Sequence, residues 1–113
     1  MSTTSVVEII KMQIATNPVL LYMKGTPDAP ECGFSATAVK ALKATGADFA
    51  YVNVLEAPSI RERLPSVSQW PTFPQLFVNG ELVGGSDIVT NMLVDGALKS
   101  LLGSAIAATE LAS

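Results

Sequence analysis

Apolar residues recur along this chain with two different periods, and the period changes from one segment to the next. Val6, Ile10 and Ile14 follow the spacing of a helix with one buried face. Val19–Met23 is apolar at every position and too short for a helix, which indicates a strand buried on both faces. Over the whole chain the pattern predicts four helices, which are Thr4–Ala15, a helix from Cys32 to just before Gly46, Ser59–Leu64, and Ser86–Leu102 with a break near Gly96. It predicts four strands, which are Val19–Met23, Asp48–Val54, Gln75–Val78 and Glu81–Val83.

The order of these elements predicts the fold. The first two strands are separated by a helix, which is typical of a parallel pair joined by a crossover. The last two are joined by Asn79-Gly80, which between two apolar runs is the strongest short signal for an antiparallel hairpin. We therefore expect an α/β chain with a thioredoxin-like fold, in which helices flank a four-stranded mixed sheet.

The composition predicts one domain over residues 1–113. Hydrophobic residues make up 49% of the chain, which suffices for a single core, and no repeat or linker divides it. We expect the folded core to span about residues 4–102. The small residues of 103–113, including Ala105–Ser113, predict a loose, flexible tail.

Charge and hydropathy exclude several classes of partner. Only 15% of the residues are charged and the net charge is -3, so no basic surface is available for nucleic acid or an anionic membrane. No apolar stretch approaches the roughly 20 residues that span a bilayer. Met1–Ile10 lacks the basic start of a secretory signal. We expect a cytoplasmic protein without nucleic-acid or membrane partners.

Cys32 is the only cysteine, and the chain has no histidine. This excludes an internal disulfide, histidine acid–base chemistry and a histidine-bound zinc. A lone cysteine is more often a small, inert side chain in a core. Cys32, however, follows the polar loop Lys24–Glu31 and begins a predicted helix, where free N–H groups and the helix dipole favour the thiolate. A reactive thiol is the better interpretation.

Three segments resemble the signatures of monothiol, CGFS-type glutaredoxins of the single-domain bacterial and organellar kind. They are Lys24–Ser35, Trp70–Leu76 and Gly84–Asp87, in the family's order and at its spacing. The first contains Cys32-Gly33-Phe34-Ser35, and its serine stands where two-thiol relatives have a resolving cysteine. A hydroxyl cannot resolve a mixed disulfide, so any turnover needs a thiol from another molecule.

The resemblance implies that glutathione binds beside Cys32, the catalytic residue. Lys24 matches a residue that faces a glutathione carboxylate, and Arg61 one that pairs with the glycine-end carboxylate, although Arg63 is close enough in sequence to leave that choice open. The proline motif implies a cis peptide bond, and the glycine-rich turn implies a carboxylate site at a helix start capped by Ser86 or Asp87. The implied glutathione residues are Lys24, Arg61, Thr72, Phe73, Pro74, Gly85, Ser86 and Asp87.

The resemblance also implies an iron–sulfur role. A 2Fe-2S cluster takes four thiolates, and one chain supplies only Cys32. The family precedent is a homodimer in which two such cysteines and two glutathione molecules hold a bridging cluster for delivery to apo iron–sulfur proteins, with a BolA-like protein as a further partner. The alternative is a glutathione-dependent oxidoreductase that reduces protein–glutathione mixed disulfides through Cys32 alone, because a reactive thiol and a glutathione site serve both functions.

Overall fold

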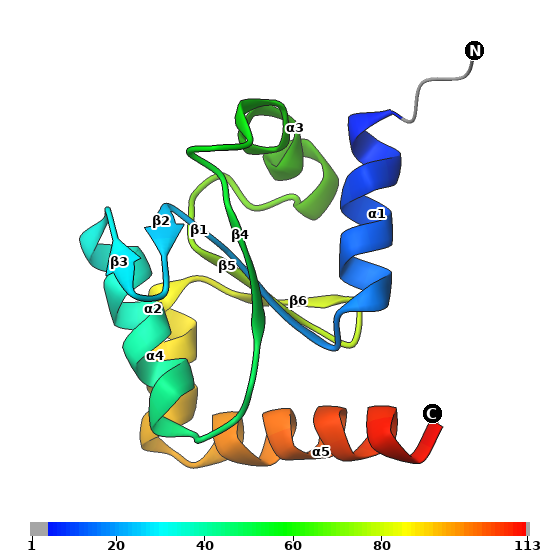
Figure 1. The fold of residues 1–113 in the computed structure, drawn as a ribbon. Coiled ribbons are helices and arrows are strands. Elements are labelled where there is room, and N and C mark those ends of the chain that lie inside the picture. The colour runs from blue at the N-terminus through cyan, green and yellow to red at the C-terminus, as the bar shows by residue number, and fades with distance from the viewer. Residues whose placement is uncertain (1–4, 113) are drawn as a thin grey trace.

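A four-stranded mixed sheet forms the centre of the protein (Figure 1). The computed structural model describes residues 5–112, with side chains as far as residue 105. In the sheet, β1 (Val19–Met23) lies between β4 (Ala50–Asn53), which is parallel to it, and β5 (Gln75–Val78), which is antiparallel. The strand β6 (Glu81–Gly84) pairs with β5 and completes the order β4-β1-β5-β6. The predicted mixed sheet and thioredoxin-like fold are confirmed.

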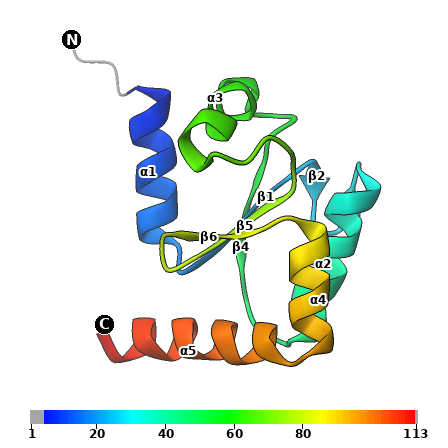
Figure 2. The same ribbon diagram turned by 180° about the vertical axis from the view of Figure 1, so that it is seen from behind.

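Helices cover both faces of this sheet, as the two opposite views in Figures 1 and 2 show. On one face α1 (Val6–Thr16) packs beside α3 (Pro58–Ser68), and on the other α2 (Gly33–Ala44) packs beside α4 (Ser86–Val94). The last helix, α5 (Ala97–Ala112), contacts α4, β1 and β5. Within residues 5–112, no helix is both long and apolar enough to cross a membrane.

The alternation of side chains along β1 divides the core in two. Val19, Leu21 and Met23 belong to a cluster with residues of α2, α4 and α5. Leu20 and Tyr22 belong to the cluster on the α1 and α3 side. All five side chains are buried, which explains why this strand is apolar at every position. With both faces packed, the strand holds its carboxyl end, and the loop that follows, in a fixed place.

The start of α1 and the turn between β5 and β6 are determined by residues at the boundary itself. The Ser5 side chain caps α1 by accepting a hydrogen bond from the Glu8 N–H at 3.1 Å. Thr4, where this helix was expected to begin, lies outside the described residues. Asn79 and Gly80 have φ values of 50° and 81°, which suit the tight turn between β5 and β6.

Three predicted segments differ in extent from the structure by more than their end residues. β4 ends at Asn53 and begins only at Ala50, because it is an edge strand that pairs with β1 alone. α3 continues past Leu64, with Pro65 inside it, to a left-handed residue at Gln69. The segment expected to be a loose tail is helical through Ala112, in keeping with the high helix propensity of alanine and with the burial of Ala105 in the core.

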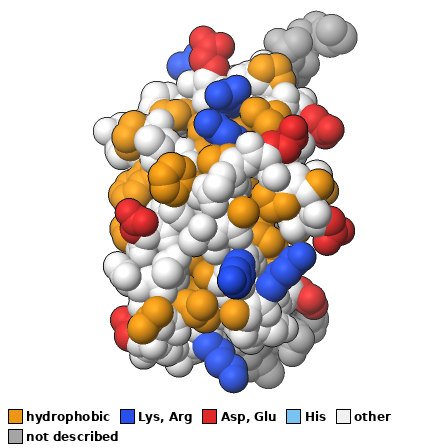
Figure 3. Space-filling model, turned by 90° about the vertical axis from the view of Figure 1, so that its left-hand side faces the viewer, with side chains coloured by type: hydrophobic (Ala, Val, Ile, Leu, Met, Phe, Trp, Pro, Cys, Tyr) orange, Lys and Arg blue, Asp and Glu red, His pale blue; other side chains and the backbone are white. Residues whose placement is uncertain are grey.

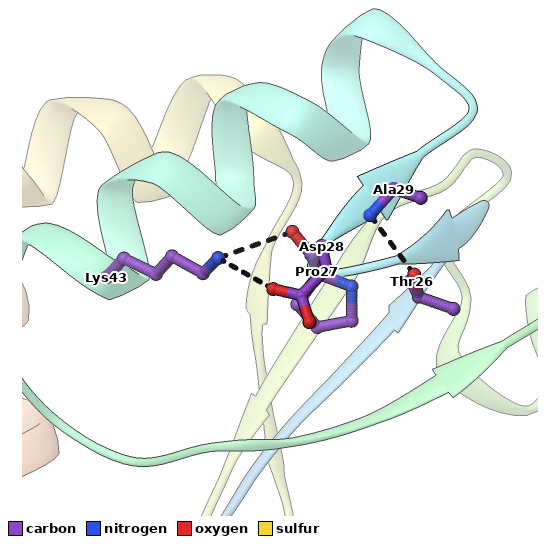
Figure 4. Close-up of polar contacts among 5 residues, drawn as sticks. All are labelled: Thr26, Pro27, Asp28, Ala29 and Lys43. Atoms are coloured by element: carbon purple, nitrogen blue, oxygen red, sulfur yellow. Dashed lines mark hydrogen bonds and ion pairs between the residues drawn. The ribbon is translucent and has the colours of Figure 1, made fainter.

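The loop before Cys32 contains a second, very small sheet that the sequence did not predict. β2 (Gly25–Thr26) and β3 (Ala29–Pro30) pair in antiparallel fashion. The Thr26 hydroxyl accepts a hydrogen bond from the Ala29 N–H at 3.1 Å and closes the turn between them (Figure 4). The loop is therefore a compact hairpin.

One side chain of α2 reaches the tip of this hairpin. The Lys43 ammonium donates to the Pro27 carbonyl at 3.4 Å and lies 3.5 Å from a carboxylate oxygen of Asp28 (Figure 4). The two charged side chains are 53% and 98% exposed, so water screens the pair and it adds little stability. The tip of the hairpin is thus weakly held, whereas its base is hydrogen-bonded to Asn53 at the end of β4.

Candidate functional site

A pocket of about 730 Å³ opens beside Cys32. Its walls come from the end of β1, the start of α2, α3, the loop before β5, and the start of α4. All nine residues named from the sequence line it, so the fold brings together side chains that are far apart along the chain. The lining residues are Lys24, Cys32, Phe34, Arg61, Pro65, Trp70, Pro71, Thr72, Phe73, Pro74, Gly85, Ser86, Asp87 and Ile88.

Cys32 is the N-cap residue of α2 and is half-buried. No other side chain caps the helix, and the N–H groups of Phe34 and Ser35 in its first turn are directed at the Cys32 sulfur. The pKa of the Cys32 thiol is lowered, chiefly by the Ser35 N–H. Desolvation opposes this shift, while the Phe34 N–H, the Ser35 hydroxyl and, last, the charge of Lys24 add to it. The helix start therefore contributes more than the lysine to making the thiol acidic.

We predict that the rate of Cys32 alkylation rises with pH through an inflection below the free-cysteine value of about 8.5. Only the thiolate reacts, and each hydrogen bond donated to it shifts the equilibrium towards the charged form, so the lowered pKa extends reactivity to lower pH. Iodoacetamide labelling followed by mass spectrometry at a series of pH values measures this. Lys24→Gln should raise the inflection only slightly. An inflection at or above the free-cysteine value would contradict the electrostatics described here.

Lys24 and Arg61, the two cations of the pocket, form no ion pair with any acidic residue in the described part of the chain. Among the described residues, the pair between Lys43 and Asp28 is the one ion pair formed, so Lys24 and Arg61 are unpaired. On the face shown in Figure 3, Lys and Arg side chains gather along the middle, and Asp and Glu side chains lie mainly towards the edges. Two unpaired cations in one pocket favour an anionic ligand, despite the net negative charge of the chain.

The structure separates the two arginines that the sequence left as alternatives. Arg61 lines the pocket beside Cys32. Arg63, two residues further along α3, lines a different hollow together with Glu62 and residues of α1 and α3. Arg61 is therefore the arginine that a ligand of the Cys32 pocket can reach.

The loop before β5 has the expected cis bond between Phe73 and Pro74. Gln75 anchors this loop. Its side chain is fully buried, and its amide donates hydrogen bonds to the Trp70 carbonyl at 3.0 Å and to the Thr72 carbonyl at 3.1 Å. These bonds connect the loop to the first residue of β5. Gln75 had no role in the sequence analysis, because its burial and its hydrogen bonds follow from the fold of this loop.

The turn before α4 differs in one detail from the prediction. Gly85, rather than Ser86 or Asp87, is the N-cap residue, and no side chain caps the helix. Ser86 is buried at the first helical position, so its hydroxyl lies one residue too late to act as the cap. A Cβ on Gly85 would stand 3.4 Å from both the Trp70 indole nitrogen and the Pro74 carbonyl oxygen. Glycine thus allows this turn to approach the cis-proline loop, and the helix start remains open towards the pocket.

The sequence analysis did not assign five apolar or aromatic lining residues, which are Phe34, Pro65, Trp70, Pro71 and Ile88. Phe34 is 64% exposed, which is unusual for a phenylalanine, and it lies two residues after the thiol. One feature of the sequence could have indicated that Phe34 belongs to the site. It is a large apolar side chain in the first turn of a helix whose buried face is already formed by Ala38, Val39 and Leu42.

The family model for glutaredoxin matches residues 19–83. Glutaredoxin 4 of Escherichia coli K12 is 60% identical over 102 residues, which cover 90% of this chain and 87% of that protein. The probable monothiol glutaredoxin GrlA of Legionella pneumophila is 58% identical over 89 residues, which cover 79% and 100%. The solution structure of reduced poplar apo GrxS14 is 40% identical, with a TM-score of 0.78, and the match covers 93% and 96% of the two chains.

These relatives cover most of the chain, and the part that they share contains the described pocket and its one cysteine. The motif around that cysteine has Ser35 in place of a second thiol, in agreement with the monothiol relative. The chain belongs to the glutaredoxin family, as one of its monothiol members.

Proposed function

We propose that this monothiol glutaredoxin binds glutathione in the pocket beside Cys32 and, as a homodimer, carries a 2Fe-2S cluster to apo iron–sulfur proteins in the cytoplasm. The observation that carries the proposal is that one pocket contains the chain's one thiol, two cations that have no ion-pair partner among the described residues, and a helix start without a side-chain cap. A small peptide with a thiol and two carboxylates has the chemistry to occupy all three.

The lining residues divide naturally between the two ends of glutathione. Lys24 and Arg61 attract the glycine-end carboxylate, since cations form strong, charge-assisted hydrogen bonds with carboxylates. The free N–H groups after Gly85 suit the γ-glutamyl carboxylate, and the Asp87 carboxylate receives its amino group. Between these ends, Thr72-Phe73-Pro74 offers backbone groups to the peptide. This arrangement directs the glutathione sulfur towards Cys32.

The ligand count supports a shared cluster. In the described part of the chain, no group of three or more His, Cys, Asp or Glu side chains is placed to hold a metal ion. Four thiolates are therefore obtained only if two subunits each contribute Cys32 and one bound glutathione. Cys32 is half-buried at an open pocket, so its sulfur is accessible to a second subunit. A BolA-like protein is the expected partner that replaces one subunit.

The second candidate function is reduction of protein–glutathione mixed disulfides, and the lowered pKa of Cys32 favours it. The Cys32 thiolate would attack the glutathione sulfur and release the protein thiolate. A second glutathione thiolate would then attack the Cys32–glutathione disulfide, restoring Cys32 and forming glutathione disulfide. This route needs no dimer, which separates it from the carrier function.

Reconstitution distinguishes the two functions. We expect anaerobic incubation with iron, sulfide and glutathione to give a coloured dimer with one 2Fe-2S cluster per two chains, and omission of glutathione to prevent it. Gel filtration with visible absorbance, together with iron and sulfide analysis, measures this result. A colourless monomer that rapidly reduces a glutathionylated substrate would replace the carrier proposal with the oxidoreductase.

The arginine pair provides a matched test of the glutathione site. We expect Arg61→Ala to weaken glutathione binding by about tenfold, because it removes a charge-assisted hydrogen bond of roughly 1.5 kcal/mol. Arg63→Ala makes the same chemical change outside the pocket and should alter the affinity less than twofold. Isothermal titration calorimetry measures both dissociation constants. Equal effects of the two substitutions would show that the pocket is not where glutathione binds.

A further inference from the structure

We propose that Asn53, which does not line the pocket, is a positioning residue for it: its side chain fixes the backbone beside Lys24 and so sets where the lysine ammonium meets an anionic ligand. Asn53 is the last residue of β4. Its Oδ1 accepts hydrogen bonds from the Gly25 N–H at 2.9 Å and the Leu55 N–H at 3.0 Å. The first bond joins residues 28 apart in sequence, so Asn53 links the end of one strand to the loop that leaves its neighbour.

The peptide group before Lys24 is hydrogen-bonded at both of its polar atoms. The Met23 carbonyl accepts a hydrogen bond from the Val54 N–H at 2.9 Å, which continues the pairing of β1 with β4. The Lys24 N–H donates to the hydroxyl of Ser35 at 3.0 Å. Ser35 is fully buried, so this bond lies away from water.

The peptide group after Lys24 also has hydrogen bonds at both of its polar atoms. The Lys24 carbonyl accepts a hydrogen bond from the Glu31 N–H at 3.0 Å, and the Gly25 N–H donates to Asn53. Two of the four bonds around Lys24 therefore have side-chain acceptors, Ser35 and Asn53. With both flanking peptides held, the Lys24 side chain extends from a fixed point, and less freedom is lost when a ligand binds it.

The chemistry of asparagine suits this task. Its carbonyl accepts two hydrogen bonds without carrying a charge. An acidic side chain at the same place would accept the same bonds, but would bring a negative charge next to a lysine that has no ion-pair partner among the described residues. The neutral acceptor thus holds the backbone and leaves the ammonium available to an anion.

A double-mutant cycle with glutathione as the probe tests this inference, which rests on the proposed glutathione site. We expect Asn53→Ala to weaken binding about three- to tenfold in the wild-type background, the loss expected if Lys24 no longer makes its hydrogen bond to the ligand. In the Lys24→Gln background, the same substitution should change the affinity less than twofold, because the group that it positions is gone. Asn17→Ala is the matched control. Its half-buried side chain donates to the Gln13 carbonyl at 2.8 Å and lies outside the pocket, so it should have no effect in either background.

Amide hydrogen exchange gives a second readout that does not depend on glutathione. Asn53→Ala should speed the exchange of the Gly25 N–H while leaving the amides of β1 protected. Equal loss of affinity in both backgrounds, or unchanged exchange at Gly25, would overturn the inference. Failure of the wild-type protein to bind glutathione would instead refute the proposed function, and the exchange result would still decide the role of Asn53. If Asn53→Ala does not fold, Asn53→Ser replaces it in the cycle, with the same expected loss of affinity in the wild-type background and the same faster exchange of the Gly25 N–H.

Discussion

Cys32→Ser protein is expected to remain a colourless monomer under reconstitution conditions that give the wild-type chain its cluster. The substitution changes one atom, but it removes the only thiolate that each chain can contribute. A serine hydroxyl stays protonated at neutral pH and does not replace a thiolate as an iron ligand. Loss of both cysteine ligands leaves two glutathione sulfurs without a protein anchor, so the visible absorbance and the dimer should disappear together.

Thr37→Ala is a suitable control for that experiment. Thr37 lies in the same helix, is exposed, and donates its hydroxyl to the Gly33 carbonyl at 3.0 Å, so its removal changes a nearby polar group without touching the pocket. This variant should form the cluster like the wild-type protein. A coloured dimer from Cys32→Ser would show that the cluster is held elsewhere, and the proposed ligand set would be wrong.

Gly25→Ala is expected to lower the free energy of unfolding by about 2–4 kcal/mol, combining backbone strain with steric overlap. Gly25 has φ +96°, in the region that favours glycine. A Cβ at this residue would lie 2.6 Å from the Glu31 nitrogen and 2.7 Å from the Ala29 carbonyl oxygen. Both atoms belong to the backbone of the β2–β3 hairpin, so the loop cannot make room without breaking its own pairing.

Gly33, the residue after Cys32, provides the matched control for Gly25→Ala. Gly33 begins α2, and a Cβ there would have no atom within 4 Å. Gly33→Ala should leave stability unchanged or raise it by up to about 1 kcal/mol, because alanine restricts the unfolded chain more than glycine does. Urea denaturation followed by far-UV circular dichroism compares the two variants. Equal midpoints would show that the hairpin tolerates a side chain at Gly25.

The elements that could be predicted are those that local sequence determines. β1 was placed correctly because all five of its side chains are buried, and the β5–β6 hairpin because Asn79-Gly80 favours one kind of turn. The end of α2 followed from Gly46, which has a φ of +77°. In each case the residues that decide the structure lie within the element or next to it.

The features that were missed depend on residues far apart in the chain. The hairpin of β2 and β3 has two residues in each strand, too few for any periodic pattern, and its base is held by Asn53 from β4. The burial of Gln75 and the choice between Arg61 and Arg63 likewise follow from how α3 and the cis-proline loop pack. The glutathione residues were named through the family resemblance, and their grouping around one pocket emerged only from the fold.

Ser35 also has a structural role that a second thiol at its position would disturb. It stands where a two-thiol relative has its second cysteine, yet here its buried oxygen accepts the backbone N–H of Lys24. Sulfur is a weaker acceptor than a hydroxyl oxygen, so a cysteine at this position would add a thiol and loosen the lysine in the same step. A change of Ser35 to cysteine would therefore alter the backbone support of Lys24 as well as the number of thiols in the chain.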